Sequence, residues 1–202
     1  MRAVLAWGLL AAATAVAVVV LAGERLRPPL PVIATLPHFV LTERGGGEVT
    51  LRELAGRPWV ANFVFTRCQV ICPQLTGRMR ELRQRLPEDA TLRSVSISVD
   101  PEHDTPEVLR QYAAAKGVTD PDWYFLTGER EAVRSLIRDG FLLAVEDTPE
   151  NVAMPVLHSS RFALVDATGR VRGYYSPLEE GEAELERLIA DARELEREER
   201  RR

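Results

Sequence analysis

The fold of this chain is decided by residues 59–73, which read WVANFVFTRCQVICP. The first part, Trp59 to Phe65, is a short aromatic and β-branched run that predicts a buried strand. Pro73 fits the first position of a helix, where its missing N–H costs nothing, and it biases Cys72 away from helical angles. We therefore expect Cys68 and Cys72, the only cysteines of the chain, in a loop at a helix N-terminus, where free N–H groups and the helix dipole favour thiolates.

Three uses of this cysteine pair are open. A structural disulfide would close a very short loop and constrain the unfolded chain only slightly. A dithiol redox couple is the second use, although reductases carry two residues between their cysteines and this chain carries three. A soft-metal site is the third use. Two thiolates and one imidazole suit copper(I), the imidazole also allows copper(II), and zinc normally takes four ligands.

The chain has three histidines from which a third ligand could come. His38 lies in a proline-bounded connection and His103 in a loop between a strand and a helix, so both suit a solvated role. His158 stands in front of an alternating run, residues 159–166, that predicts a strand before a turn at Gly169. By position alone, a structural or solvated role is favoured for His158 over a ligand role.

Strands and helices alternate after the cysteine helix. The pattern predicts a second strand over residues 92–99, a helix from Thr105-Pro106 to Gly117, a third strand over 123–126 and a helix around 132–137. This alternation predicts an α/β fold with a central, mainly parallel sheet flanked by helices. A hairpin near the N-terminus, residues 39–51, and a final hairpin on one side of the sheet complete it.

Functional sites in such sheets gather at the ends of strands. We therefore expect Cys68, Asp100 and His158 to converge at one edge of the sheet. Asp100 suits two roles, as a hydrogen-bond partner of the site or as a cap at the end of its strand. The cap is the favoured role.

The N-terminus carries a membrane signal, because residues 3–22 are apolar, uncharged and long enough to cross a bilayer as a helix. A retained anchor is favoured over a cleaved signal peptide, whose apolar core is normally shorter. We expect residues 1–24 to be the transmembrane anchor or uncleaved signal, 25–37 a proline-rich tether, 38–195 one folded domain and 196–202 a charged tail. The thiol chemistry favours a domain outside the cell membrane, where disulfides persist.

Composition argues against several classes of function. The net charge of −4 gives no reason to expect nucleic-acid binding. The glycines at 45–47 lack the spacing and the following helix of a phosphate loop, and neither a Ser-His-Asp elbow nor a paired-carboxylate cleft is evident. The cysteine pair therefore remains the main sign of chemistry in the chain.

Four motifs occur in this chain in a fixed order: FVFTRC-x-x-x-CP at 63–73, SVDPE-x-DTP at 98–106, LTG at 126–128, and His158 ahead of the VD-x-x-G hairpin at 165–169. Together they resemble the Sco/SenC family of copper chaperones. The resemblance covers nearly all of residues 38–190 and implies a thioredoxin-like fold with an N-terminal membrane anchor. It also implies a site for copper(I) or copper(II) made by Cys68, Cys72 and His158.

Members of this family assemble the binuclear copper centre of cytochrome c oxidase, as a copper donor, as a reductase of the target's cysteines, or as both. The resemblance implies a single-pass protein of the bacterial cytoplasmic membrane with its domain on the outer face. Its partner would be a copper-accepting oxidase subunit or another copper protein. The chain departs from the family at Gln69-Val70-Ile71, where members often carry proline or an acidic residue, and at Leu157, where an acidic residue often precedes the histidine. Such neighbours tune metal affinity and redox potential.

Two functions follow from these observations. The leading one is a membrane-anchored copper-binding chaperone with Cys68, Cys72 and His158 as metal ligands. The alternative is a thiol:disulfide oxidoreductase in which Cys68 and Cys72 cycle without obligatory copper and His158 tunes their acidity. A peroxidase is a third and weaker interpretation. His158 discriminates between the first two, because its loss should weaken copper binding strongly and leave most dithiol exchange intact.

Overall fold

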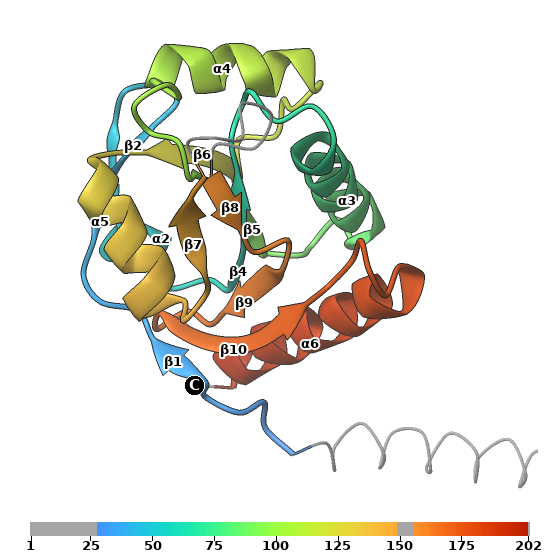
Figure 1. Ribbon diagram of the computed structural model, residues 1–202. Helices are drawn as coiled ribbons and strands as arrows, with labels where there is room; N and C mark the ends of the chain where they lie inside the picture. Colours follow the sequence, from blue (N-terminus) through green and yellow to red (C-terminus); the bar gives the residue numbers. More distant parts are fainter. Residues whose placement is uncertain (1–27, 149–155, 202) are drawn as a thin grey trace, which may run out of the picture. The chain divides into compact units, whose positions relative to one another are not determined.

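The computed structural model of the chain describes residues 28–148 and 156–201 (Figure 1). Contacts divide the chain into two compact units, residues 1–30 and 31–202, and the fold below is that of the second unit. An eight-stranded sheet runs through this unit, with helices on both of its faces. A two-stranded sheet is separate from it.

The strands of the large sheet are, in chain order, β1 (Ala34–Thr35), β2 (Val40–Glu43), β3 (Glu48–Thr50), β4 (Trp59–Val64), β5 (Arg93–Ser98), β6 (Trp123–Thr127), β9 (Phe162–Val165) and β10 (Arg170–Tyr175). The small sheet pairs β7 (Val145–Asp147) with β8 (Val156–His158). The helices are α2 (Leu51–Leu54), α3 (Ile71–Arg85), α4 (Pro106–Ala115), α5 (Arg130–Ser135), the π-helix η1 (Leu136–Gly140) that continues α5, and α6 (Glu182–Arg200).

The large sheet is mixed, with the strand order β1-β10-β9-β4-β5-β6-β2-β3. Parallel pairing is confined to β4–β5 and β5–β6, the strands joined by the crossover helices α3 and α4. The two expected hairpins, β2–β3 and β9–β10, pair antiparallel with β6 and β4 and enlarge the sheet on both sides. The prediction of a mainly parallel sheet is therefore wrong. Each hairpin adds antiparallel strands, and a strand's own residues do not record the direction of its neighbour.

The two faces of the central strands carry different side chains. On one face, Phe141 at the end of η1 packs edge-on against Trp59 and Phe63, with ring centroids 6.0 and 5.2 Å away. On the other face, Asn62 and Ser96 share a buried hydrogen bond of 2.7 Å. Figure 1 shows α5 on one side of the sheet and α3 with α6 on the other. Every residue of β4 is buried, so the loop that carries the cysteines follows a strand fixed on both faces.

Part of the expected tether joins the sheet. The N–H of Ile33 donates to the carbonyl of Val171 at 2.8 Å and that of Leu36 to Gly169 at 2.9 Å, and β1 pairs with the edge of β10. The expected anchor, residues 1–24, lies outside the described residues. Within the described ranges, no helix is long and apolar enough to cross a membrane.

The C-terminal helix α6 extends through most of the expected charged tail, as far as Arg200. The buried Arg172 of β10 holds this end in place. Its guanidinium donates to Asp166 at 2.9 Å, to Glu198 at 3.4 Å and to the carbonyl of Pro31 at 3.1 Å. One side chain thus ties the first residues of the unit to its last helical turns.

Candidate functional site

The two cysteines flank the start of α3, just after the carboxyl end of β4. Cys68 lies in the loop, and Cys72 is the second residue of the helix, which begins at Ile71. The predictions that Pro73 is the first helical residue and that Cys72 avoids helical angles are therefore wrong. The N–H groups of the whole first turn lack acceptors within the helix, so a proline is tolerated at the third position as well as at the first.

The two sulfurs have different environments. The Cys68 Sγ accepts a hydrogen bond from the Cys72 N–H at 3.3 Å. Burial opposes ionisation of Cys68, but the N–H groups of residues 70–72 and the Cys72 thiol outweigh it and lower the pKa of Cys68. Burial dominates at Cys72 and, with the neighbouring Cys68 sulfur, raises its pKa well above that of an ordinary thiol, although the Phe65 N–H donates to its Sγ at 3.5 Å. Cys68 is therefore the first thiolate of the pair, and Cys72 keeps its proton at neutral pH.

His158 lies at the end of β8, in the small sheet, and its side chain approaches Cys72. Its Nε2 lies 3.7 Å from the Cys72 Sγ, and its Nδ1 lies 3.0 Å from the carbonyl oxygen of Ser159. The ring stands edge-on to Phe65, with 5.7 Å between centroids. Burial lowers the pKa of His158, and the Ser159 carbonyl opposes this effect. A neutral imidazole that donates from Nδ1 to Ser159 presents the lone pair of Nε2 to Cys72.

The separation between Cys72 and His158 suits two ligands of one metal ion. Bonds of about 2.3 Å to sulfur and about 2.0 Å to nitrogen, at tetrahedral to trigonal angles, place the two ligand atoms about 3.5–3.8 Å apart. A soft ion such as copper(I) takes this donor set. Among residues 28–148 and 156–201, no three His, Cys, Asp or Glu side chains already form a cluster that could hold an ion.

The carboxylate of Asp100 binds Arg67, the residue before Cys68. The Arg67 Nε and Nη2 donate to one carboxylate oxygen at 3.1 and 2.6 Å. The backbone carbonyl of Asp100 accepts from the N–H groups of His103 and Asp104 at 3.1 and 2.9 Å, which closes the end of β5. Asp100 thus acts at its strand end and on the cysteine loop, and its role as a support for metal ligands stays a prediction.

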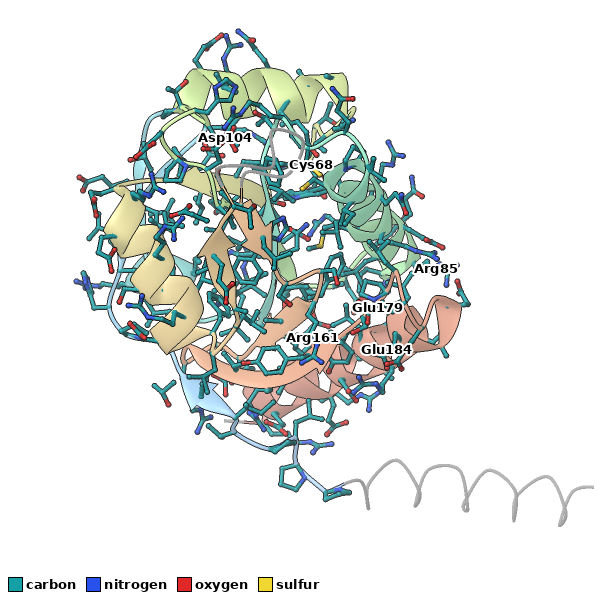
Figure 2. The ribbon with its side chains drawn as sticks, in the orientation of Figure 1. Cys68, Arg85, Asp104, Arg161, Glu179 and Glu184 are labelled. Atoms are coloured by element: carbon teal, nitrogen blue, oxygen red, sulfur yellow. The ribbon has the colours of Figure 1, made fainter. Side chains whose placement is uncertain are left out.

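Sequence reasoning missed the role of Asp104, a fully buried carboxylate that lies near Cys68 below α4 (Figure 2). It accepts hydrogen bonds from the Thr66 hydroxyl at 2.5 Å, the Thr66 N–H at 3.1 Å and the Ser98 hydroxyl at 2.6 Å. Burial raises the pKa of Asp104, and these donors oppose the rise. The carboxylate ties the loop before Cys68 to the end of β5. One sequence feature could have indicated this role: Asp104 directly precedes Thr105, the residue that caps α4 at the same edge of the sheet.

A second buried contact supports Cys72 from within α3. The Thr76 hydroxyl donates to the Cys72 carbonyl at 2.9 Å and lies 2.9 Å from the hydroxyl of Tyr112 in α4. Burial raises the pKa of Tyr112 to about 12, so this hydroxyl stays neutral. Helix α4 is thereby fastened to the first turns of α3, where Cys72 lies.

Ion pairs hold the small sheet that carries His158. Asp147 of β7 binds Arg130 at 2.8 Å and also Arg134, both in α5. Arg130 in turn binds Glu102, in the loop after β5, at 2.7 Å. Each partly exposed pair adds little stability, but the three together link β7 through α5 to the loop that follows β5.

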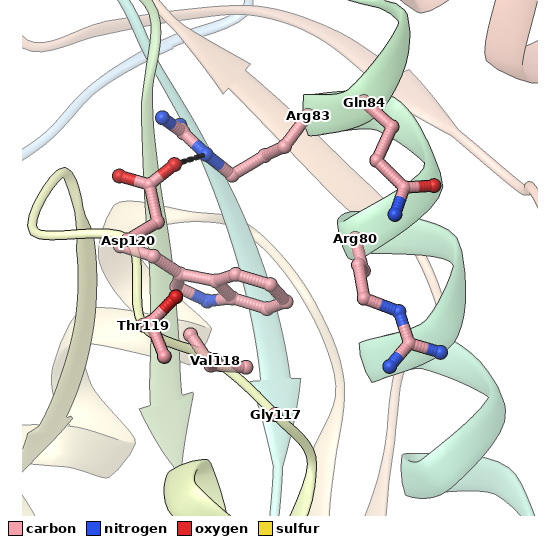
Figure 3. Close-up of a pocket in the computed structure, with 8 residues that line it drawn as sticks. Arg80, Arg83, Gln84, Gly117, Val118, Thr119 and Asp120 are labelled. Atoms are coloured by element: carbon pink, nitrogen blue, oxygen red, sulfur yellow. Dashed lines mark hydrogen bonds and ion pairs between the residues drawn. The ribbon is translucent and has the colours of Figure 1, made fainter.

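Two of the cavities in the described part of the chain lie far apart in sequence and differ in their relation to the candidate site. One of about 430 Å³ opens beside His158, between residues 142–144 and 157–161. The other, of about 240 Å³, lies between α3 and the segment before β6, where Arg83 pairs with Asp120 near Trp123 (Figure 3). Of these two, the first alone includes a residue of the candidate site.

The sequence model of the SCO1/SenC family matches residues 30–193 of this chain. The chain belongs to the SCO1/SenC family. Among known proteins, the SCO1 protein homolog of Bacillus subtilis is 34% identical over 158 residues, which cover 78% of this chain and 80% of that protein. The family match at residues 30–193 includes both cysteines and His158.

Solved SCO1/SenC structures agree with the fold. The structure of BsSco, described as a member of the Sco family of cytochrome c oxidase assembly proteins with a disulfide switch, is 32% identical, with a TM-score of 0.72 over 85% of this chain and 97% of that chain. ScoI of Bradyrhizobium japonicum, with copper bound, is 27% identical, with a TM-score of 0.64 over 76% and 99%. These structures confirm the thioredoxin-like α/β fold that the sequence resemblance implies.

Proposed function

We propose that this SCO1/SenC protein is a membrane-anchored copper chaperone, in which Cys68, Cys72 and His158 bind copper for the binuclear copper site of cytochrome c oxidase. The observation that carries the proposal is the 3.7 Å separation between the Cys72 Sγ and the His158 Nε2. The copper held by the ScoI neighbour and the assembly role described for BsSco support it. Copper is the cargo, so the site must both hold the ion and release it.

The three proposed ligands differ in how readily they lose the proton that metal binding displaces. Cys68 is the more acidic thiol and offers the first sulfur, and His158 is already neutral. Cys72 must lose its proton when the ion binds, so binding releases a proton and weakens as the pH falls. The cysteines are backed by β4 and α3, so an acceptor's sulfur or nitrogen reaches the ion from the side of His158, where the cavity opens.

The proposal includes the part of the chain that precedes the described residues. Residues 1–24 anchor the protein in the bacterial cytoplasmic membrane, 25–37 form the tether, 38–195 the copper-binding domain on the outer face and 196–202 the charged tail. Protease added to spheroplasts tests this arrangement. The domain should be digested while the cells stay intact, and protection of the domain would contradict an outer location.

The unequal pKa values of the cysteines favour a second function, reduction of an acceptor's disulfide. The Cys68 thiolate attacks one sulfur of that disulfide, a mixed disulfide forms, and the acceptor's other sulfur leaves as a thiolate. Cys72 then loses its proton and attacks Cys68, which releases the second acceptor thiolate. The acceptor gains two electrons, and the oxidised Cys68–Cys72 pair is reduced again by an external thiol.

X-ray absorption of the copper-loaded full chain in detergent tests the leading function. We expect two copper–sulfur bonds and one copper–nitrogen bond for each bound ion, with the nitrogen lost in His158→Ala. Sulfur ligands alone in the wild-type protein would contradict the three-ligand site. Failure of the reduced protein to bind copper at all would leave the oxidoreductase as the function.

A further inference from the structure

Leu142 combines two unfavourable features. It is the one non-glycine residue in the described ranges with a positive φ, at 51°. This left-handed conformation crowds the Cβ of an L-residue and is normally taken by glycine or asparagine. The Leu142 side chain is also 58% exposed, so burial compensates little for that conformation. Glycine or asparagine would fold more favourably here, which indicates that this leucine serves a purpose outside the fold.

Leu142 and His158 both line the same cavity. The cavity measures about 430 Å³, within the range of about 300–1,000 Å³ of ligand-binding pockets, and Leu157 lines it as well. Of the six exposed large apolar side chains in the described ranges, these two line the cavity and a third, Val70, lies between the cysteines. Half of the six exposed apolar side chains therefore lie on the cavity or in the cysteine loop, and exposed apolar patches are a feature of surfaces that bind other proteins.

The same cavity also has polar lining residues. Ser160 donates a hydrogen bond to Glu179 at 3.1 Å, and Arg161 lies on the cavity as well. Figure 2 shows Arg161 and Glu179 below the labelled Cys68. One charge of each sign on the cavity favours one orientation of a bound segment without adding net charge.

We propose that Leu142 and Leu157 form an apolar platform that docks a copper-ligating segment of the acceptor protein in the cavity beside His158. This inference rests on the proposed function. Ligand exchange requires an incoming sulfur or nitrogen to reach the ion while the chaperone still holds it, and the cavity is where His158 borders open space. The occupant must therefore carry a metal ligand with an apolar side chain next to it. A small free thiol such as glutathione carries a metal ligand but no such apolar side chain.

The test compares a protein probe with a small one in the full chain, in detergent and with Cys72→Ser. The protein probe is the domain of the oxidase subunit that carries the binuclear copper site, with one of its cysteines joined to thionitrobenzoate. The small probe is glutathione joined to the same group. In each reaction the Cys68 thiolate attacks the probe's sulfur, a new S–S bond forms, and thionitrobenzoate leaves as a coloured anion whose release gives the rate.

Leu142→Asn should slow the reaction with the protein probe about tenfold, the effect expected for loss of an interface anchor. The rate with the glutathione probe should stay the same, and the Tm should stay the same or rise because asparagine tolerates the left-handed backbone. Leu157→Asn should act on the rates in the same way. Val40→Thr, at a 47% exposed valine of β2 outside the cavity, is the matched control and should leave both rates unchanged.

Three results would each contradict the proposed docking platform. The first is an unchanged rate with the protein probe in Leu142→Asn, and the second is equal slowing of both probes in that variant. The third is a Cys72→Ser chain without further changes that reacts with the protein probe no faster than with the glutathione probe. The proposed function fails by a different result. It fails if the chain with both cysteines binds no copper, whatever the rates with the two probes are.

Discussion

The imidazole of His158 lies 3.7 Å from the thiol of Cys72, although 86 positions separate these residues in the chain. The topology of the fold creates this contact. Strand β4 leads the cysteines to the carboxyl end of the parallel strands, and β8, paired with β7, returns His158 to the same end. The candidate site therefore depends on the packing of two separate sheets rather than on one local motif.

Cys68 should react with iodoacetamide at a lower pH than Cys72 does. Backbone N–H groups lower the pKa of Cys68 against the effect of burial, whereas burial raises that of Cys72. In Cys72→Ser we expect the alkylation rate of Cys68 to reach half its maximum below about pH 8.5, the ordinary value for a thiol. In Cys68→Ser, Cys72 should show no such midpoint below that pH.

The same two variants unfolded in urea are the control for this alkylation experiment, because each cysteine then titrates near its ordinary pKa of about 8.5. A midpoint for Cys68 that is higher in the folded chain than in the unfolded chain would contradict the hydrogen bonding at its sulfur.

Asp104→Ala should lower the free energy of unfolding by about 2–4 kcal/mol, because the donors of Thr66 and Ser98 lose their buried acceptor. The loop before Cys68 would lose its tie to β5, so copper affinity should fall as well. Urea unfolding at pH 7 and a copper competition assay measure the two effects. Asp100→Ala, which removes a partly exposed pair with Arg67, is the matched control and should cost less than about 1 kcal/mol. Equal losses in both variants would contradict the role assigned to Asp104.

Asp166 should make the stability of the domain depend on acid pH. Burial opposes its ionisation, but hydrogen bonds from Thr168, Arg170 and Arg172 outweigh burial and lower the pKa of Asp166. An acid with a lowered pKa stabilises the fold fully above its unfolded-state pKa, near 3.9, and loses this effect as the pH falls through the folded-state value. Asp166→Asn should therefore cost about 3 kcal/mol at pH 7, and this difference from wild type should shrink below about pH 4.

Urea unfolding at pH 7, 4 and 3 measures the effect of Asp166→Asn. Glu88→Gln, at an exposed glutamate, is the control and should match the wild-type protein at each pH. A difference between Asp166→Asn and wild type that stays constant over the whole range would show that Asp166 acts through its shape rather than its charge.

Sequence patterns predicted the elements that neighbouring residues determine. The expected strands at 59–65 and 92–99 are β4 (Trp59–Val64) and β5 (Arg93–Ser98). Helix α4 begins as expected, with Pro106 at its start and the Thr105 hydroxyl accepting the Val108 N–H at 3.3 Å. In these elements the buried face, the cap and the proline all act within a few residues of one another.

Features that depend on distant segments were beyond the sequence pattern. The antiparallel edges of the sheet and the β7–β8 pair depend on which strands meet, which periodicity does not record. Asp104 is buried because Thr66, 38 positions away, supplies two of its donors. The left-handed backbone of Leu142 is likewise imposed by its surroundings, since leucine has no local preference for it.

The most direct test of the central claim is a copper(I) titration of the reduced full chain in detergent against a coloured competing chelator, with His158→Ala and His103→Ala in parallel. The account predicts one tightly held copper per wild-type chain. It predicts an affinity at least about 100-fold lower in His158→Ala, since changes behind a ligand alone cost about 10–100-fold, and no change at the exposed His103. Equal copper affinity in wild type and His158→Ala would contradict a site made by Cys68, Cys72 and His158.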